Sequence, residues 1–200
     1  MSLINAIFTA AFDNNLVFTQ VIGLVSVIIL AGRPFDAVRF GCLLGLATAA
    51  SGILGSALYA GFLAPWGTAY FAPAVIAVLN AAIVYAASAV MSCGLAGADR
   101  LAALRRGGML SASAALLGVT LSNTVAFDAG TATAETLMGT AIGSGAGVFL
   151  AVVLFALVRQ RVDDALVPKA LRGLPISLVT ASLMALAFSG VAGIAGGMFA

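Results

Sequence analysis

The chain has 200 residues, of which 62% are hydrophobic and only 8% are charged, and its mean hydropathy is +1.17. A soluble domain carries about a quarter of its residues as charged side chains, so this composition excludes a soluble globular protein and predicts an integral membrane protein. The formal net charge of +2, without a dense basic run, gives no indication of nucleic-acid binding. With no histidine and only two cysteines, a thiolate cluster built from this chain alone is limited to two ligands.

Six apolar runs approach or exceed the roughly 20 residues that a helix needs to cross a hydrocarbon core of about 30 Å. They are Leu3–Leu30, Ala37–Leu63, Tyr70–Met91, Met109–Phe127, Leu137–Val158 and Ile176–Phe199. The runs are continuously apolar rather than alternating, which predicts helices and not a barrel. No connection is long enough for a second domain, so we expect one all-α integral membrane domain with six transmembrane helices over residues 1–200.

The basic residues predict the orientation of this domain. All of them fall at the first, third and fifth connections between the expected spans: Arg33 and Arg39; Arg100, Arg105 and Arg106; Arg159, Arg161, Lys169 and Arg172. Short cytoplasmic loops carry an excess of Lys and Arg. We therefore expect these connections in the cytoplasm and both termini on the outer side.

Three spans in each half require that the halves, if they are repeats, be inverted relative to each other. Two inverted three-helix repeats, over about 1–100 and 101–200, are supported by polar interruptions in the first and fourth expected spans, Asp13-Asn14-Asn15 and Ser122-Asn123-Thr124. Inverted repeats with broken helices build midplane sites in many membrane proteins. The second span of each half also contains glycines. We interpret these mainly as residues that allow close helix packing, which is common in helical membrane proteins. They are Gly41 and Gly45, and Gly139, Gly143 and Gly147.

The interruption at Asp13-Asn14-Asn15 is the more informative one. It lies about ten residues into the first span, near the middle of the membrane at 1.5 Å per residue, where an ionised Asp costs several kcal/mol unless it is paired, protonated or hydrated. We therefore expect two half-helices whose ends, with Asp13, Asn14, Asn15 and Asn123, face an ion path, a cofactor or a partner chain. The alternative is a short first span that begins after Asn15.

Several motifs resemble the small six-span A-type subunit of Rnf complexes and the E-type subunit of sodium-pumping NADH:quinone oxidoreductases (Nqr). The resemblance runs nearly end to end and is densest at the two ends of the chain. The motifs are Asp13-Asn14-Asn15-Leu16, Val21-Ile22-Gly23-Leu24, Gly45-Leu46-Ala47-Thr48, Phe155-Ala156-Leu157-Val158-Arg159, Val167-Pro168, Leu171-Arg172-Gly173 and Ile176–Gly190 (ISLVTASLMALAFSG).

This resemblance implies that the chain is a subunit of a redox-driven, ion-translocating oxidoreductase in a bacterial-type inner membrane. The subunit is not expected to be catalytic alone. It implies an oppositely oriented six-span homologue as partner, with Na⁺ or H⁺ as the transported ion. It further implies a [2Fe-2S] centre shared between the two subunits, with two cysteines from each. The alternative function is a stand-alone small ion or solute transporter or channel on the same scaffold, without a redox role.

The sequence departs from the family at the expected iron ligands. The family's first cysteine follows Gly-Leu, whereas here Gly23-Leu24 is followed by Val25. The second falls on Thr124 when Asn123 is aligned, or on Gly118 when residues are counted back from Gly143. None of these residues replaces a soft thiolate. We expect no cofactor from this chain alone, so that either the centre is absent or the electron route is different.

The two cysteines, Cys42 and Cys93, lie near the cytoplasmic ends of the second and third expected spans. One hypothesis makes them replacement metal ligands. The competing interpretation is stronger, because isolated cysteines commonly behave as small buried hydrophobes and no C-x-x-C spacing is present.

Overall fold

The structure is a computed structural model that describes residues 3–30, 34–91, 113–162 and 167–191. Within these ranges the chain forms helices and turns and contains no strand, which confirms the expected all-α class. The elements are α1 (Leu3–Phe8), the π-helix η1 (Thr9–Asp13), α2 (Leu24–Leu30), α3 (Pro34–Leu58), the π-helix η2 (Tyr59–Leu63), the 3₁₀-helix η3 (Ala69–Phe71), α4 (Ala72–Met91), α6 (Ala114–Asp128), α7 (Ala134–Arg161), the 3₁₀-helix η4 (Lys169–Leu171) and α8 (Leu174–Val191).

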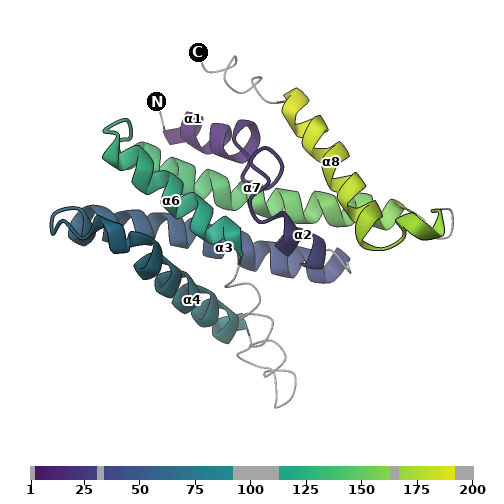
Figure 1. Ribbon diagram of the computed structural model, residues 1–200, viewed down its shortest axis with the longest axis horizontal. Coiled ribbons are helices and arrows are strands. Elements are labelled where there is room, and N and C mark those ends of the chain that lie inside the picture. The colour runs from purple at the N-terminus through teal and green to yellow at the C-terminus, as the bar shows by residue number, and fades with distance from the viewer. Residues whose placement is uncertain (1–2, 31–33, 92–112, 163–166, 192–200) are drawn as a thin grey trace.

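The two longest helices, α3 and α7, pack against each other along their length at the centre of the molecule (Figure 1). They are antiparallel, because Gly41 near the start of α3 faces Val152 and Gly52 further along faces Ala141. A methyl group on Gly145 would lie 2.5 Å from the carbonyl oxygen of Gly45. Glycine is therefore required at this crossing, where small residues let helix backbones approach closely.

The remaining helices surround this pair. Helix α4 contacts α3 and α6, whereas α8 lies beside α7 (Figure 1). The segment α1–η1 runs parallel to α7, since Ala6 lies against Gly139 and Ala11 lies against Gly147. The predicted glycines of α7 thus provide the groove in which the first helix lies.

Three helical stretches are long and apolar enough to span a membrane: Ala37–Leu63, Ala69–Ala89 and Ala134–Arg161. They agree with the second, third and fifth expected spans. The first, fourth and sixth expected spans overlap the shorter apolar helices Leu3–Asp13, Ala114–Asp128 and Leu174–Gly190. Residues 109–112 and 192–199 of those spans lie outside the described residues. The six-span count therefore remains a prediction.

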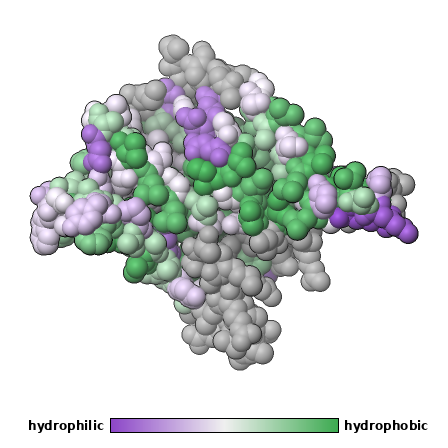
Figure 2. Space-filling model, viewed as in Figure 1, coloured by the Kyte–Doolittle hydropathy of each residue, from purple (hydrophilic) through white to green (hydrophobic). Residues whose placement is uncertain are grey.

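Large apolar side chains cover much of the surface, as expected for a membrane protein. Exposed residues include Leu46, Val78, Leu183 and Leu186. Figure 2 shows hydrophobic residues over most of this face, with a hydrophilic cluster over the loop that follows η1 and another beyond the end of α7. The surface hydropathy and the helix lengths thus agree with the composition.

Candidate functional site

The first helix is broken where the polar cluster predicted a break. The helical segment ends at Asp13, the chain passes through turns over residues 14–23, and helix resumes at Leu24. Val21 and Gly23 adopt φ values of 60° and 83°, and a bond of 2.7 Å from the Ile22 N–H to the Leu16 carbonyl closes the loop. A β-branched residue such as Val21 rarely adopts a left-handed backbone conformation, which is strained. The surrounding contacts therefore hold this break in a specific shape.

Asn15 organises the break through its side chain, which is 0% exposed. Its amide nitrogen donates to the Ala11 carbonyl at 2.8 Å and to the Gly147 carbonyl at 3.2 Å. Its amide oxygen accepts from the backbone N–H groups of Val17 at 3.0 Å and Phe18 at 3.2 Å. One side chain therefore satisfies the backbone groups freed by the end of the helix and joins the break to α7.

The break lies at the middle of the long helix beside it, because Gly147 is central in α7. Asp13 is half-buried and Asn14 is exposed there, as are Thr19, Gln20 and Val21. Non-helical residues are therefore exposed on the surface of the described chain at the depth where a spanning helix has its midpoint.

The predicted interruption at Asn123 is wrong, because α6 continues through it from Ala114 to Asp128. The buried Asn123 amide nitrogen donates to the Leu137 carbonyl at 3.2 Å, and its oxygen accepts from the Thr140 hydroxyl at 2.8 Å. The side chain bonds across to α7 and does not compete for the α6 backbone. Asn15 and Asn123 thus contact α7 at different levels and are not brought together. Residues 92–112, which precede α6, lie outside the described chain.

The two alternative positions for a second iron ligand lie in different environments. Gly118 faces the break, since a methyl group there would be 2.9 Å from Ile22 Cγ2. Thr124 lies further along α6, where its hydroxyl donates to the Leu121 carbonyl at 2.8 Å. Val25 is 70% exposed at the start of α2. A hydrocarbon side chain, a glycine and a hydroxyl bonded to its own helix do not fit an iron–sulfur centre.

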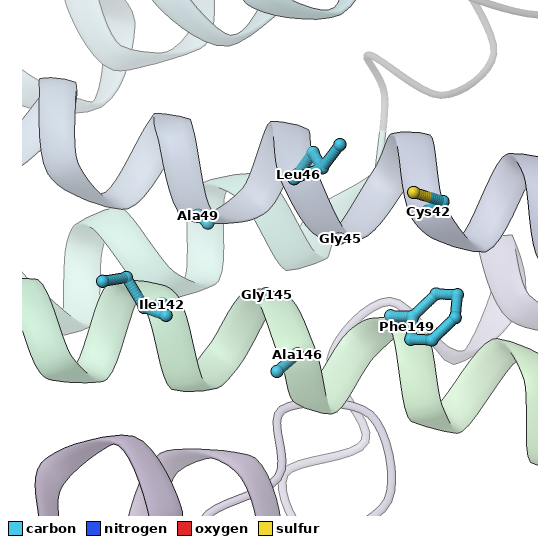
Figure 3. Close-up of a pocket in the computed structure, with 8 residues that line it drawn as sticks. All are labelled: Cys42, Gly45, Leu46, Ala49, Ile142, Gly145, Ala146 and Phe149. Atoms are coloured by element: carbon cyan, nitrogen blue, oxygen red, sulfur yellow. The ribbon is translucent and has the colours of Figure 1, made fainter. Parts of the chain in front are cut away.

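Cys42 lies in an apolar groove between α3 and α7 (Figure 3). The groove has a volume of about 290 Å³ and is lined by Cys42, Gly45, Leu46, Ala49, Ile142, Gly145, Ala146 and Phe149. Cys93, its proposed partner, lies outside the described residues. In the part of the chain that the structure describes, no three His, Cys, Asp or Glu side chains gather as a metal site, so nothing here supports the hypothesis of replacement ligands.

The structure also brings together three residues that no sequence pattern singled out, which we call the polar junction: Ser51 on α3, Asn80 on α4 and Thr120 on α6. Ser51 Oγ donates to Asn80 Oδ1 and lies 2.9 Å from Thr120 Oγ1 and 3.3 Å from the Leu116 carbonyl oxygen. All three side chains are buried. A lone Asn in the middle of the third expected span is the sequence signal that could have found them.

The described basic residues gather at one end of the helix pair. Arg39 lies near the start of α3 and Arg161 ends α7, at the same end of this antiparallel pair. Arg159 at that end donates from Nε to Ser177 Oγ on α8 at 3.1 Å. Asp128 and Glu135 lie at the opposite end, where Asp128 accepts a hydrogen bond of 2.6 Å from the Tyr59 hydroxyl.

Comparison with known proteins places this architecture in a family. Residues 3–195 match the family described as Rnf-Nqr subunit, membrane protein. The chain is 29% identical over 196 residues to the A-type subunit of the Na(+)-translocating ferredoxin:NAD(+) oxidoreductase complex of Acetobacterium woodii, covering 96% of this chain and 98% of that relative.

Shorter matches have higher identity. The A-type subunit of the ion-translocating oxidoreductase complex of Syntrophotalea carbinolica is 53% identical over 57 residues, which is 28% of this chain and 30% of the relative. The E-type subunit of the Na(+)-translocating NADH-quinone reductase of Chlamydia trachomatis serovar D is 51% identical over 53 residues, which is 26% of this chain and 22% of the relative. Because the family match covers nearly the whole chain, the protein belongs to the Rnf-Nqr subunit family of membrane proteins.

Proposed function

We propose that this chain is a membrane subunit of an ion-translocating electron-transport complex of the Rnf/Nqr type, and that it pairs with an oppositely oriented homologous six-span subunit. The relative from Acetobacterium woodii, which is named as a component of such a complex, aligns with it over nearly its full length. We further propose an inner-membrane location with both termini on the outer side. The gathering of the described basic residues, among them Arg39, Arg159 and Arg161, at one end of the helix pair supports that orientation.

The observation that carries the pairing is the open break between Asp13 and Leu24. Lipid-exposed irregular backbone does not occur within the hydrocarbon region, because each unsatisfied peptide group there costs several kcal/mol. Asn15 satisfies part of the break with its side chain and with its carbonyl oxygen, which accepts from the N–H groups of Thr19 and Gln20. Thr19, Gln20 and Val21 nevertheless remain exposed outside any helix. A second protein chain placed over these residues removes them from lipid.

The contacts of the central pair support an inverted repeat. Gly41 faces Val152, and Gly52 faces Ala141. A two-fold axis through the crossing of Gly45 and Gly145 makes position 41 equivalent to 141 and position 52 equivalent to 152. The axis therefore converts the contact between 41 and 152 into the contact between 141 and 52. The succession of buried, half-buried and exposed residues is also identical over 41–57 and 141–157. Such an axis in the membrane plane relates repeats of opposite topology.

The iron–sulfur centre implied by the family does not extend to this chain. Val25, Gly118 and Thr124 supply no thiolate, so we propose that this subunit contributes no ligand at its break. Any cluster of the assembled complex then takes its ligands from other chains. The role proposed for this subunit is to position a partner and to form part of the ion path.

A photo-crosslinking amino acid tests the pairing. Placed at Gln20 in the chain expressed with its neighbouring subunits, it should form a crosslink to a second membrane subunit. The same amino acid at Val78, which is exposed in the middle of the continuous helix α4, should give much less of this product. Equal crosslinking at both positions, or crosslinking of Gln20 to lipid alone, would refute the proposal that a partner covers the break.

A further inference from the structure

The polar junction lies at the middle of three helices at once. Ser51 is near the centre of Ala37–Leu63, Asn80 is near the centre of Ala69–Ala89, and Thr120 is near the centre of α6. Ser, Thr and Asn at this depth commonly hydrogen-bond one helix to another, so a further role needs a group that this bonding leaves over. The junction is also completely buried, so neither lipid nor a partner chain reaches it directly.

One group of the junction is left without a hydrogen-bond partner. The Asn80 side chain is 1% exposed, and its amide nitrogen has no acceptor. Asn15, the other buried Asn at this depth, uses both ends of its amide. A contact that only held helices together would gain nothing from an unpaired amide, since burying it in an apolar environment costs several kcal/mol. The unpaired N–H groups of Asn80 point to a bound acceptor, for which a water molecule is suited.

Around that amide the junction presents neutral oxygen atoms. They are Ser51 Oγ, Thr120 Oγ1 and Asn80 Oδ1. The Leu116 carbonyl oxygen, which belongs to the intact helix α6, accepts from Thr120 Oγ1 at 2.9 Å. Hydroxyl and amide oxygens are ligands for hard cations. The absence of a carboxylate from this set suits a monovalent rather than a divalent ion.

We propose that the polar junction binds one sodium ion together with a water molecule, as a site on the ion path of this subunit. The oxygens coordinate the ion, and the water accepts hydrogen bonds from the Asn80 amide. This proposal rests on the ion-translocating function proposed above and assigns that function a location separate from the break at Asp13.

A series of polar groups leads from the junction toward the outer end of α6. Beyond Thr120, the side chain of Asn123 bonds to Thr140 on α7. At the end of the helix, Asp128 and Tyr59 form their hydrogen bond. These positions recur at three- to five-residue steps along α6, so they follow its length from the acidic end to the middle of the membrane. A carboxylate at the entrance raises the local concentration of cations.

The test is equilibrium binding of ²²Na⁺ to the complex purified with all its subunits, alongside ²²Na⁺ uptake into proteoliposomes on reduction of the complex. Thr120→Val removes one oxygen from the junction without changing the size of the side chain, and should raise the Kd for ²²Na⁺ about tenfold, as expected for a loss near 1.4 kcal/mol. Thr120→Ser keeps the oxygen and should bind within about twofold of the wild type.

The matched control is Thr180→Val, which removes a buried hydroxyl that donates to Ile176 on α8, away from the junction. It should leave ²²Na⁺ affinity unchanged. If Thr120→Val fails to assemble, Asn80→Asp provides the second variant, because a carboxylate of the same shape should lower the Kd for ²²Na⁺.

The outcomes separate this inference from the proposed function. Sodium uptake by the wild type with equal affinities in Thr120→Val and Thr180→Val would refute the site and leave the function standing. A complex that translocates H⁺ without binding ²²Na⁺ would also refute the sodium site and leave the proposed function standing. A complex that translocates neither ion on reduction would overturn both proposals.

Discussion

Replacement of Asn15 by alanine should strongly destabilise this protein, because four hydrogen bonds at the break depend on one amide. The variant leaves the N–H groups of Val17 and Phe18 without their acceptor in a fully buried site. Each unsatisfied buried donor costs about 1–3 kcal/mol. The Gly147 carbonyl belongs to α7 and keeps its intrahelical bond, so the loss of its hydrogen bond from Asn15 costs less.

The two donors together cost about 2–6 kcal/mol, a large fraction of the roughly 5–15 kcal/mol that stabilises a typical domain. For a chain of this length, 1 kcal/mol corresponds to about 2–4 °C in Tm, so we expect the unfolding temperature to fall by about 10 °C. Fluorescence-monitored thermal unfolding of the complex in detergent measures this change.

Asn14→Ala is the matched control. Asn14 is the neighbouring residue of the same type, but its side chain is exposed, and substitutions at such positions change stability by about 0.5 kcal/mol or less. If Asn15→Ala is no less stable than Asn14→Ala, the idea that Asn15 holds the break together is refuted.

The helix packing, the missing thiolates and the charges each give a further prediction. Gly145→Ala should reduce the free energy of unfolding by about 1–3 kcal/mol, since the added methyl group meets the Gly45 carbonyl. Gly61→Ala, with nothing within 4 Å of its methyl group, should be neutral. Equal unfolding temperatures for the two variants would count against close packing at the crossing. Val25→Cys alone should add no membrane-embedded iron signal in electron paramagnetic resonance of the purified complex, because neither Gly118 nor Thr124 supplies a second thiolate. A new signal would show that ligands from elsewhere complete the site. Reporter fusions at position 165 should be active in the cytoplasm and fusions at position 67 outside, and the reverse pattern would overturn the proposed orientation.

The sequence alone determined the class of protein and the position of its long spans. A 62% hydrophobic composition leaves too few polar residues for a wet surface, and the run Ala37–Leu63 coincides with a helical stretch of the structure. The break at Asp13-Asn14-Asn15 was also predictable, because several adjacent polar residues inside an apolar run are costly at membrane depth unless the helix is interrupted there.

Only the tertiary structure decided what each isolated polar residue does. Asn15 and Asn123 look alike in sequence, yet the first caps a broken helix and the second bonds from an intact helix to Thr140. The polar junction joins Ser51 to Asn80 and Thr120 across three helices, and each member alone is one polar residue in an apolar run. A side-chain amide takes whichever partners the fold brings within about 3 Å. The folding of distant helices against one another therefore determines whether an Asn caps a broken helix, joins two helices or, like Asn80, keeps its amide nitrogen without a partner.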